Sequence, residues 1–217
     1  MSSDIHDLLR NCERIGTSTW SDALDDLGVQ GVVRGLTQRS GEGRFAAIAI
    51  TAKQRIGRIG EFEKVELGAD KMLDALGPGK VLMVDMGGGD ISTFGGLAAL
   101  NAKQRDAAAV IIDGGCRDLQ DIRKTGLWVA TRHVVPITGK SRVKLDSLNV
   151  PISIGGINVM TGDLVIGDET GIVVIPKSIT EQTVKLAERK FLLDAEVEKG
   201  LKSGLNFLDA AKGAKYM

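Results

Sequence analysis

The stretch "KVLMVDMGGGDISTFGGLAALNAKQRDAAAVIIDGGCRDLQDI", residues 80–122, decides the fold class. Two apolar runs, "KVLMVDM" and "AAVIID", have the composition of buried strands, and a glycine-rich segment follows each of them. We expect the second run to end in a turn at Gly114 and Gly115. Helices are predicted over residues 97–105 and 119–124, and "LWVATRHVV" is predicted to be the next strand. This order of strands and helices predicts a parallel sheet with helices packed on it.

The segment before this central unit is predicted to contain helices and one strand. Short helices are expected over residues 4–14 and 19–27, with Thr17, Ser18 or Thr19 as the N-cap of the second helix. An apolar strand is expected over residues 44–53, and "GADKMLDAL" is typical of a helix stopped by the following "GPG".

The segment after the central unit has a different pattern. Residues 140–177 contain short alternating runs separated by glycine turns, which predicts antiparallel strands. Ser178 and Glu181 form an S-x-x-E capping box that should open a C-terminal helix over residues 178–200. Its apolar residues cover more than one stripe, so we expect this helix to pack against another subunit as well as its own core.

Composition limits the function classes. A chain of 217 residues predicts a single domain, residues 1–217, and 28 basic against 28 acidic residues leave no net field to attract nucleic acid. No apolar run approaches the roughly 20 residues of a membrane span, and two cysteines with a charged N-terminus favour a cytoplasmic location. With only two histidines, the chain is a poor candidate for a zinc site, so any metal should be a hard cation held by oxygen atoms.

Several familiar motifs fail on inspection. "TGKS" lacks the first glycine and the following helix of a phosphate loop, and "GGGDIS" lacks the last glycine of a dinucleotide fingerprint. No lysine lies inside an apolar run, as a Schiff-base lysine should. Cys116 adjoins Arg117, but no histidine is placed to pair with it, which favours a small inert residue at a strand end.

Two loops remain as candidates for chemistry. Gly95 and Gly96 stand just before a predicted helix, where bare N–H groups form an anion site. Arg117 and Asp118 follow the next strand, and the carboxyl ends of parallel strands meet at one edge of a sheet. Arg117 suits a carboxylate and Asp118 a divalent cation. The alternatives are that the glycines only turn the chain and that Arg117 and Asp118 form an exposed ion pair.

Four segments together carry a family resemblance: "TSTWSDALDDLGVQGVVRGL", "GPGKVLMVDMGGGD", "GGLAALNAKQRDAAAVIIDGGCRDLQDIRKTGLWVATR" and "MTGDLVIGDETGIVVIP". The chain resembles the class II pyruvate aldolases that act on 4-hydroxy-4-methyl-2-oxoglutarate and 4-carboxy-4-hydroxy-2-oxoadipate. Those enzymes share a fold with the regulator of ribonuclease E activity A. The resemblance implies an α/β fold, the swivelling β/β/α domain, with a central mixed sheet flanked by helices. It also implies a homotrimer or homohexamer with active sites at subunit interfaces.

The resemblance further implies a divalent metal, Mg²⁺ first and Mn²⁺ or Co²⁺ as alternatives, and oxaloacetate decarboxylation as a companion activity. By position it assigns Asp118 to the metal, Arg117 to the substrate, and the substrate loop to Gly95, Gly96, Leu97 and Ala98. The family motif has an acidic residue where this chain has Gly96, and that residue is expected to hold a metal-bound water. Asp90 and Asp113 are the candidates to replace it.

These expectations point to a lyase that cleaves a 4-hydroxy-2-oxo acid into pyruvate and a second oxo acid, with Arg117 and Asp118 as catalytic residues. The alternative is a non-catalytic trimeric regulator that binds ribonuclease E or another protein partner. Regulators of this fold typically lack the metal-binding aspartate, so Asp118 favours an enzyme. A lyase for a sugar acid on the same scaffold is a third possibility.

Overall fold

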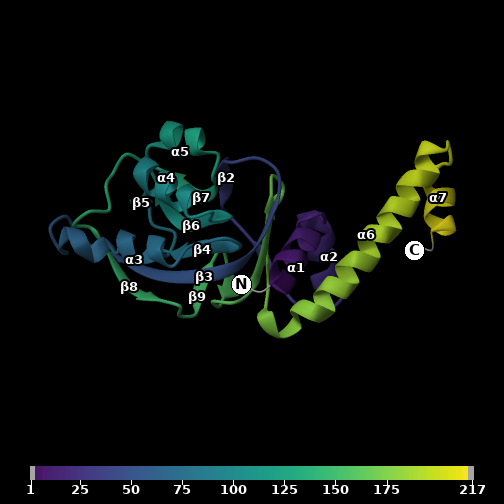
Figure 1. Cartoon of the computed structure of the whole chain (residues 1–217), viewed down its shortest axis with the longest axis horizontal. Helices are drawn as coiled ribbons and strands as arrows, with labels where there is room; N and C mark the ends of the chain where they lie inside the picture. Colours follow the sequence, from purple (N-terminus) through teal and green to yellow (C-terminus); the bar gives the residue numbers. More distant parts are fainter. Residues whose placement is uncertain (1–2, 215–217) are drawn as a thin grey trace.

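A large mixed sheet forms the centre of the computed structural model, which describes residues 3–214 (Figure 1). The strands are β1 (Val32–Val33), β2 (Thr37–Ser40), β3 (Phe45–Ile56), β4 (Lys80–Asp85), β5 (Ser92–Phe94), β6 (Ala109–Cys116), β7 (Trp128–Val134), β8 (Val143–Leu148), β9 (Ile152–Ile154), β10 (Ile157–Val159), β11 (Leu164–Asp168) and β12 (Gly171–Ile175). The main sheet has the order β1-β12-β11-β3-β4-β6-β7-β2, with β5 beside β6 and β8 beside β3, while β9 and β10 form a separate hairpin.

Helices cover this sheet on two sides. They are α1 (Ser3–Glu13), α2 (Thr17–Asp25), α3 (Ala69–Asp74), α4 (Gly96–Gln104), α5 (Leu119–Thr125), α6 (Thr180–Lys202) and α7 (Phe207–Gly213), with short 3-10 helices η1 (Lys64–Leu67) and η2 (Lys177–Ile179). Across residues 3–214, no helix combines the length and apolar character needed to cross a membrane.

The predicted parallel unit and antiparallel flank are both confirmed. Strands β3, β4, β6 and β7 are parallel neighbours, and β11 continues the sheet antiparallel to β3. All eight residues of β6 are buried, as a strand covered on both faces requires. The expected fold class, a central mixed sheet flanked by helices, is therefore correct.

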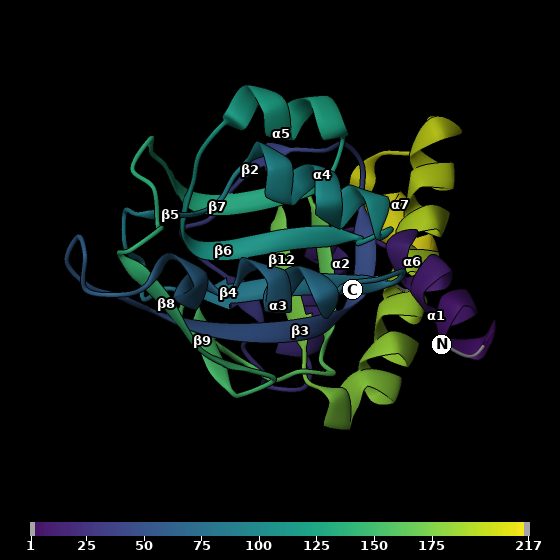
Figure 2. The same ribbon diagram turned by 60° about the vertical axis from the view of Figure 1, so that its left-hand side comes forward.

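Side chains along the central strands point alternately to the two faces of the sheet, and each face has its own hydrophobic core. In β6, Val110 and Ile112 face α3, α4 and α5, whereas Ala109 and Ile111 face the β9–β10 hairpin and β12. A third cluster joins α1, α2 and the first half of α6 to β11 and β12. In Figure 2 the helices α3, α4 and α5 lie together on one face of the sheet. The carboxyl ends of β4, β5 and β6 thus lie on the side of the sheet where α4 and α5 begin.

The predicted turn at Gly114 and Gly115 is wrong, because both residues belong to β6. A Cβ at Gly114 would lie 2.4 Å from the Met86 sulfur, and a Cβ at Gly115 would lie 2.8 Å from the Ile91 carbonyl oxygen. Glycine is therefore required here for close packing inside a strand. The turn itself occurs later, at Asp118, which has φ 54° and precedes α5.

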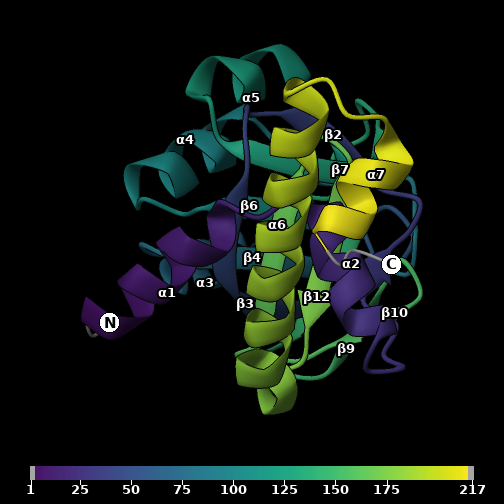
Figure 3. The same ribbon diagram turned by 90° about the vertical axis from the view of Figure 1, so that its right-hand side faces the viewer.

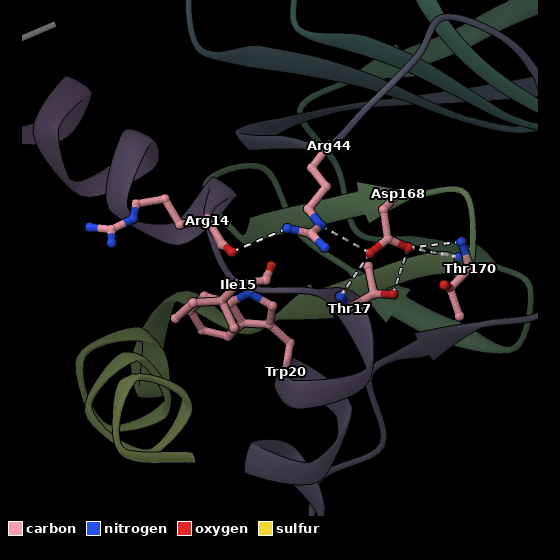
Figure 4. A network of polar contacts seen from close by, with 8 residues as sticks. Arg14, Ile15, Thr17, Trp20, Arg44, Asp168 and Thr170 are labelled. Carbon is pink, nitrogen blue, oxygen red and sulfur yellow. Dashed lines mark hydrogen bonds and ion pairs between the residues drawn. The ribbon is translucent and has the colours of Figure 1, made fainter. Parts of the chain in front are cut away.

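Helix α2 is capped by a distant residue and not by a threonine or serine of its own. Gly16 is the N-cap, and the carboxylate of Asp168 accepts hydrogen bonds from the Thr17 backbone N–H at 3.0 Å and the Thr17 hydroxyl at 2.7 Å. Figure 4 shows Asp168 reaching from the end of β11 to this helix, with Arg44 beside it at 3.7 Å. The cap lies 151 residues away in the chain, so no local pattern indicates it.

Helix α6 begins later than predicted. The turn η2 comes first, α6 starts at Thr180, and the expected capping box is not formed because the Glu181 carboxylate pairs with Lys185 at 2.7 Å. Figure 1 shows α6 running away from the sheet, and Figure 3 shows α7 folded back beside the far end of α6. Large apolar side chains are exposed on this arm: Leu192, Leu201, Leu205, Phe207 and Leu208.

Candidate functional site

The two loops singled out in the sequence meet at one pocket of about 370 Å³. It opens at the carboxyl ends of β5 and β6, between α3, α4 and the segment 138–140. Five of the six predicted site residues line it: Gly95, Leu97, Ala98, Arg117 and Asp118. The lining is completed by Leu67, Ala69, Leu73, Ser92, Thr93, Phe94, Asn101, Thr138, Gly139 and Lys140.

Arg117 and Asp118 are held by backbone contacts that leave their charged ends half exposed. The Arg117 backbone N–H donates to the Phe94 carbonyl at 2.9 Å, which fixes the end of β6 against β5. The Arg117 Nε atom lies 3.6 Å from the Asp118 carboxylate, with side-chain exposures of 37% and 45%. A pair this exposed contributes little to stability, so both charges remain available to a ligand.

Gly96 contacts the same carboxylate through its backbone. Its N–H donates to Asp118 Oδ2 at 3.3 Å, at the first residue of α4. The first N–H groups of a helix lack acceptors within the helix and favour negative charge, so Asp118 and the pocket lie in a field that suits anions. This hydrogen bond keeps Gly96 next to Asp118, beside the pocket, although Gly96 is not one of the lining residues.

The space beside Gly96 is already filled by another acidic residue. A Cβ at Gly96 would lie 2.7 Å from the Asp121 Cβ and 3.6 Å from the Asp118 Cβ. An aspartate or glutamate at position 96 would thus need α5 to move. Asp121, which the sequence did not single out, is the acidic residue that packs against position 96, where the family motif has its acidic residue. The Asp121 carboxylate pairs with Lys124 at 2.7 Å.

The two replacements suggested by the sequence do not lie at this site. Asp113 accepts a hydrogen bond from Arg132 Nε at 2.6 Å, and this contact raises the pKa of Arg132. Asp113 also accepts a hydrogen bond from the Gly155 backbone N–H at 2.8 Å. Neither Asp113 nor Asp90 lines the pocket.

The oxygen atoms present fit a hard divalent cation that retains most of its water. Within residues 3–214, no three His, Cys, Asp or Glu side chains gather at one point as a complete metal cage would require. Asp118 offers one half-exposed carboxylate to the pocket, and Mg²⁺ is commonly held by one or two carboxylates, waters and substrate oxygens. Asp118 is thus the residue of this lining that could hold such a cation.

Cys116 and the histidines take no part in the pocket. Cys116 is fully buried, and burial raises the pKa of its thiol. This agrees with the expectation of an inert residue. His133 contacts the Gly88 carbonyl oxygen through Nε2 at 3.0 Å, away from the pocket, and His6 is on α1.

Sequence reasoning missed the residues that complete the wall. Thr93 belongs to β5, a strand of three residues that is too short to give a periodic pattern. Lys140 belongs to the "TGKS" segment, which lacks the features of a phosphate loop. This segment lines the pocket next to β5, where Ser92 and Thr138 form a β-bridge.

The comparisons with known proteins agree with this fold. The model of the RraA-like family (Aldolase/RraA) matches residues 17–174. A 4-hydroxy-4-methyl-2-oxoglutarate aldolase of Thermus thermophilus is 29% identical over 158 residues, 71% of this chain and 90% of the relative. A Halalkalibacterium halodurans protein, named provisionally for the same activity, is 27% identical over 203 residues, 93% of this chain and 91% of its own. Other relatives match over less of their length: the aligned part is 47% of a Methanocaldococcus jannaschii protein and 35% of Legionella pneumophila protein DlpA.

Solved structures give the same result. A Pseudomonas syringae protein has a TM-score of 0.84 at 25% identity, covering 94% of this chain and 96% of the other. Streptomyces coelicolor RraAS2, described as an unusual member of the RNase ES inhibitor RraA protein family, has a TM-score of 0.75 at 26% identity, covering 83% and 91%. The match over most of the sequence, together with these structures, shows that the chain belongs to the RraA-like family.

Proposed function

We propose that this chain is a divalent-metal-dependent lyase that cleaves a 4-hydroxy-2-oxo acid to pyruvate and a second oxo acid. The observation that carries the proposal is the placement of Arg117 and Asp118 in one pocket with the N-terminus of α4. A cation, a guanidinium and free helix N–H groups are three separate means of stabilising an oxyanion. The aldolase name of the Thermus thermophilus relative supports the same reaction class.

Arg117, Asp118 and the start of α4 each have a defined task in this reaction. Arg117 donates two parallel hydrogen bonds to the carboxylate beside the reacting carbonyl, and Asp118 holds the cation. When bound, the cation supplies a Lewis acid for the 2-oxo and carboxylate oxygens of the substrate. The N–H groups at the start of α4 stabilise negative charge without reorganisation, because the helix fixes them in advance.

The proton steps depend on water, because the two histidines lie outside the pocket lining. Arg117 and Asp118 are exposed enough for solvent to enter beside them. Water ordered by the Asp118 carboxylate takes the proton of the substrate 4-hydroxyl as the C3–C4 bond breaks. It then returns a proton to the CH₂ carbon of the enolate, which becomes the methyl group of pyruvate. Because loss of CO₂ from oxaloacetate leaves the same enolate of pyruvate, oxaloacetate decarboxylation is proposed as a side activity.

The second candidate is a regulator without chemistry that binds a ribonuclease or another protein partner. The RraAS2 neighbour, described as a member of an RNase inhibitor family, favours it. We also propose a homotrimer or homohexamer for either function, supported by the exposed apolar residues of α6 and α7.

A coupled pyruvate assay separates the two functions. Oxaloacetate and several 4-hydroxy-2-oxo acids are tested with added Mg²⁺, Mn²⁺ or Co²⁺ and with chelator, and metal-dependent pyruvate release is expected. Absence of release from all substrates with all metals would refute the lyase.

Two variants test the assigned roles. Arg117→Lys should lower kcat/KM by about tenfold to a hundredfold, because lysine cannot form the paired hydrogen bonds, and added metal should not restore it. Asp118→Asn should shift the metal dependence to higher concentration, with partial recovery in excess metal. Arg58→Lys and Asp22→Asn, both exposed and outside the pocket, are the matched controls. An unchanged metal dependence in Asp118→Asn would place the metal elsewhere.

A further inference from the structure

The pocket that contains Arg117 and Asp118 is charged at the end of β6 and apolar where α3 and α4 border it. Residues 64–74 form η1 and α3 and include five charged residues, yet the residues of this segment that line the pocket are all apolar. The first turn of α4 adds two more apolar residues to the lining. Together these residues form an apolar wall: Leu67, Ala69, Leu73, Leu97 and Ala98.

Leu97 leaves the largest apolar surface of this wall in water. It is 85% exposed, whereas Leu67 is 9% exposed and Leu73 packs partly buried against the core. Contact with an apolar group removes such surface from water, which is favourable, whereas contact with a carboxylate strips water from the charge without providing a hydrogen bond. The apolar wall therefore favours an uncharged, apolar part of a ligand.

Two uncharged polar side chains of the lining are engaged within the protein. The Ser92 hydroxyl donates to the Phe94 carbonyl oxygen at 3.2 Å, and Asn101 Oδ1 accepts from Arg105 Nε at 3.0 Å. Lys140 is exposed and belongs to the segment 138–140, not to η1, α3 or α4. The helices that form the apolar wall thus bring no charge of their own to the pocket.

The two helices of the apolar wall are tied together at their carboxyl ends. They lie side by side on one face of the sheet (Figure 2). Arg105, the C-cap of α4, bonds to Asn101 and also pairs with Asp74, the last residue of α3. Met72 of α3 and Ala99 of α4 belong to the same buried core. The separation of the two helices is therefore set before a ligand binds, as in most small-molecule sites.

We propose that the apolar wall is the subsite for an apolar substituent at C4 of the substrate. The preferred 4-hydroxy-2-oxo acid then carries an alkyl or arylalkyl group on C4, and the second product is a 2-oxo acid with an apolar side chain. As the C3–C4 bond breaks, the 4-hydroxyl loses its proton and C4 becomes the new carbonyl carbon. C3 takes the electron pair as the enolate of pyruvate and is then protonated, so no oxidant or reductant is needed. This assignment rests on the proposed lyase function and adds the class of the second product.

The binding test uses three 2-oxo acids that share the reacting end and differ in the tail. Pyruvate ends in a methyl group, 5-methyl-2-oxohexanoate in a branched apolar tail, and 2-oxoglutarate in a tail of similar shape that carries a carboxylate. None has a 4-hydroxyl group, so none is cleaved, and each is titrated by calorimetry in the presence of Mg²⁺. The apolar probe, 5-methyl-2-oxohexanoate, should bind about tenfold more tightly than pyruvate, and more tightly than 2-oxoglutarate.

Matched variants on α4 locate the preference. Leu97→Gln keeps the length of the side chain and makes it polar, so the advantage of the apolar probe over pyruvate should fall roughly fivefold. Leu97→Met should retain the advantage. Leu100→Gln, 47% exposed on the same helix and outside the lining, should retain it too. Because both positions are exposed, all three variants should fold, which thermal unfolding checks.

Tighter binding of 2-oxoglutarate than of the apolar probe would overturn the subsite, and so would an equal effect of Leu97→Gln and Leu100→Gln. Pyruvate release from 4-hydroxy-2-oxo acids with a methyl or an isobutyl group on C4 is measured alongside. If the apolar probe binds with the expected preference but no substrate releases pyruvate, the lyase fails and the subsite stands. If pyruvate is released while the apolar probe binds no better than pyruvate, the subsite fails alone.

Discussion

Replacing Asp168 should separate helix α2 from the sheet, and the structure sets the size of the effect. Asp168 is 8% exposed, and its carboxylate accepts four hydrogen bonds, two from Thr17 and one each from the Thr170 and Gly171 backbone N–H groups. Thr17 is 3% exposed, so in Asp168→Ala its N–H and hydroxyl lose their partner in a dry environment. Thr170 is exposed, and water can replace its bond.

Two buried donors left unpaired should cost about 2–4 kcal/mol, at roughly 1–2 kcal/mol each. The half-exposed Arg44 at 3.7 Å adds less than about 1 kcal/mol. For a chain of this size the melting temperature should fall by roughly 10 °C. Asp168→Asn retains one acceptor oxygen and should lose about half as much.

The assay is urea unfolding followed by circular dichroism, with the exposed Glu169→Ala as control, expected within about 0.5 kcal/mol of wild type. Burial alone would raise the pKa of Asp168, but hydrogen bonds from Thr17, Thr170 and Gly171 hold that pKa below its ordinary value of 3.8. Its contribution is therefore complete above pH 4 and is lost as pH falls through the lowered pKa. The gap between wild type and Asp168→Asn should narrow only in that acidic range. A loss below about 1 kcal/mol in Asp168→Ala at pH 7 would refute the capping role.

Three further predictions concern other parts of the chain. Gly96→Asp should destabilise the protein by about 1–3 kcal/mol through overpacking against Asp121, and adding Asp121→Gly should recover most of the loss in chemical unfolding. Thiol titration of the native protein at pH 8 should detect neither cysteine, because both are buried and burial raises the pKa of Cys12 to about 12 and that of Cys116 above its ordinary value. Multi-angle light scattering at micromolar concentration should give a trimer or a multiple of it, and Leu192→Glu on the exposed arm should weaken it; a stable wild-type monomer would contradict this.

Elements with a strong local pattern could be predicted from the sequence. The apolar runs at β3, β4, β6 and β7 and the helices between them were all found, because burial on both faces leaves a continuous hydrophobic signal. Strand β5 and helix α7 were missed. The strand has three residues. The helix buries little beyond Ala210, Ala211 and its C-cap Ala214, so neither element shows a clear hydrophobic periodicity in the sequence.

Contacts between distant segments could not be predicted. The cap of α2 by Asp168, the packing of Gly96 against Asp121 and the place of Lys140 in the pocket lining all depend on the tertiary fold. The sequence did place Arg117 and Asp118 correctly at one strand end, because the parallel order of strands determines which edge a loop reaches.

Arg117 and Asp118 are consecutive residues, and they can line one pocket only if the backbone is not extended at this point. In a continuing strand, Arg117 and Asp118 would point to opposite faces. Asp118 instead has φ 54° and ψ 42°, the left-handed conformation, which breaks the alternation and lets both side chains line the same cavity. Aspartate and asparagine tolerate this conformation better than most residues, because their short polar side chains bond locally. Asp118→Asn therefore changes the charge with little backbone cost, whereas Asp118→Ala adds about 1 kcal/mol of strain and obscures the role of the carboxylate.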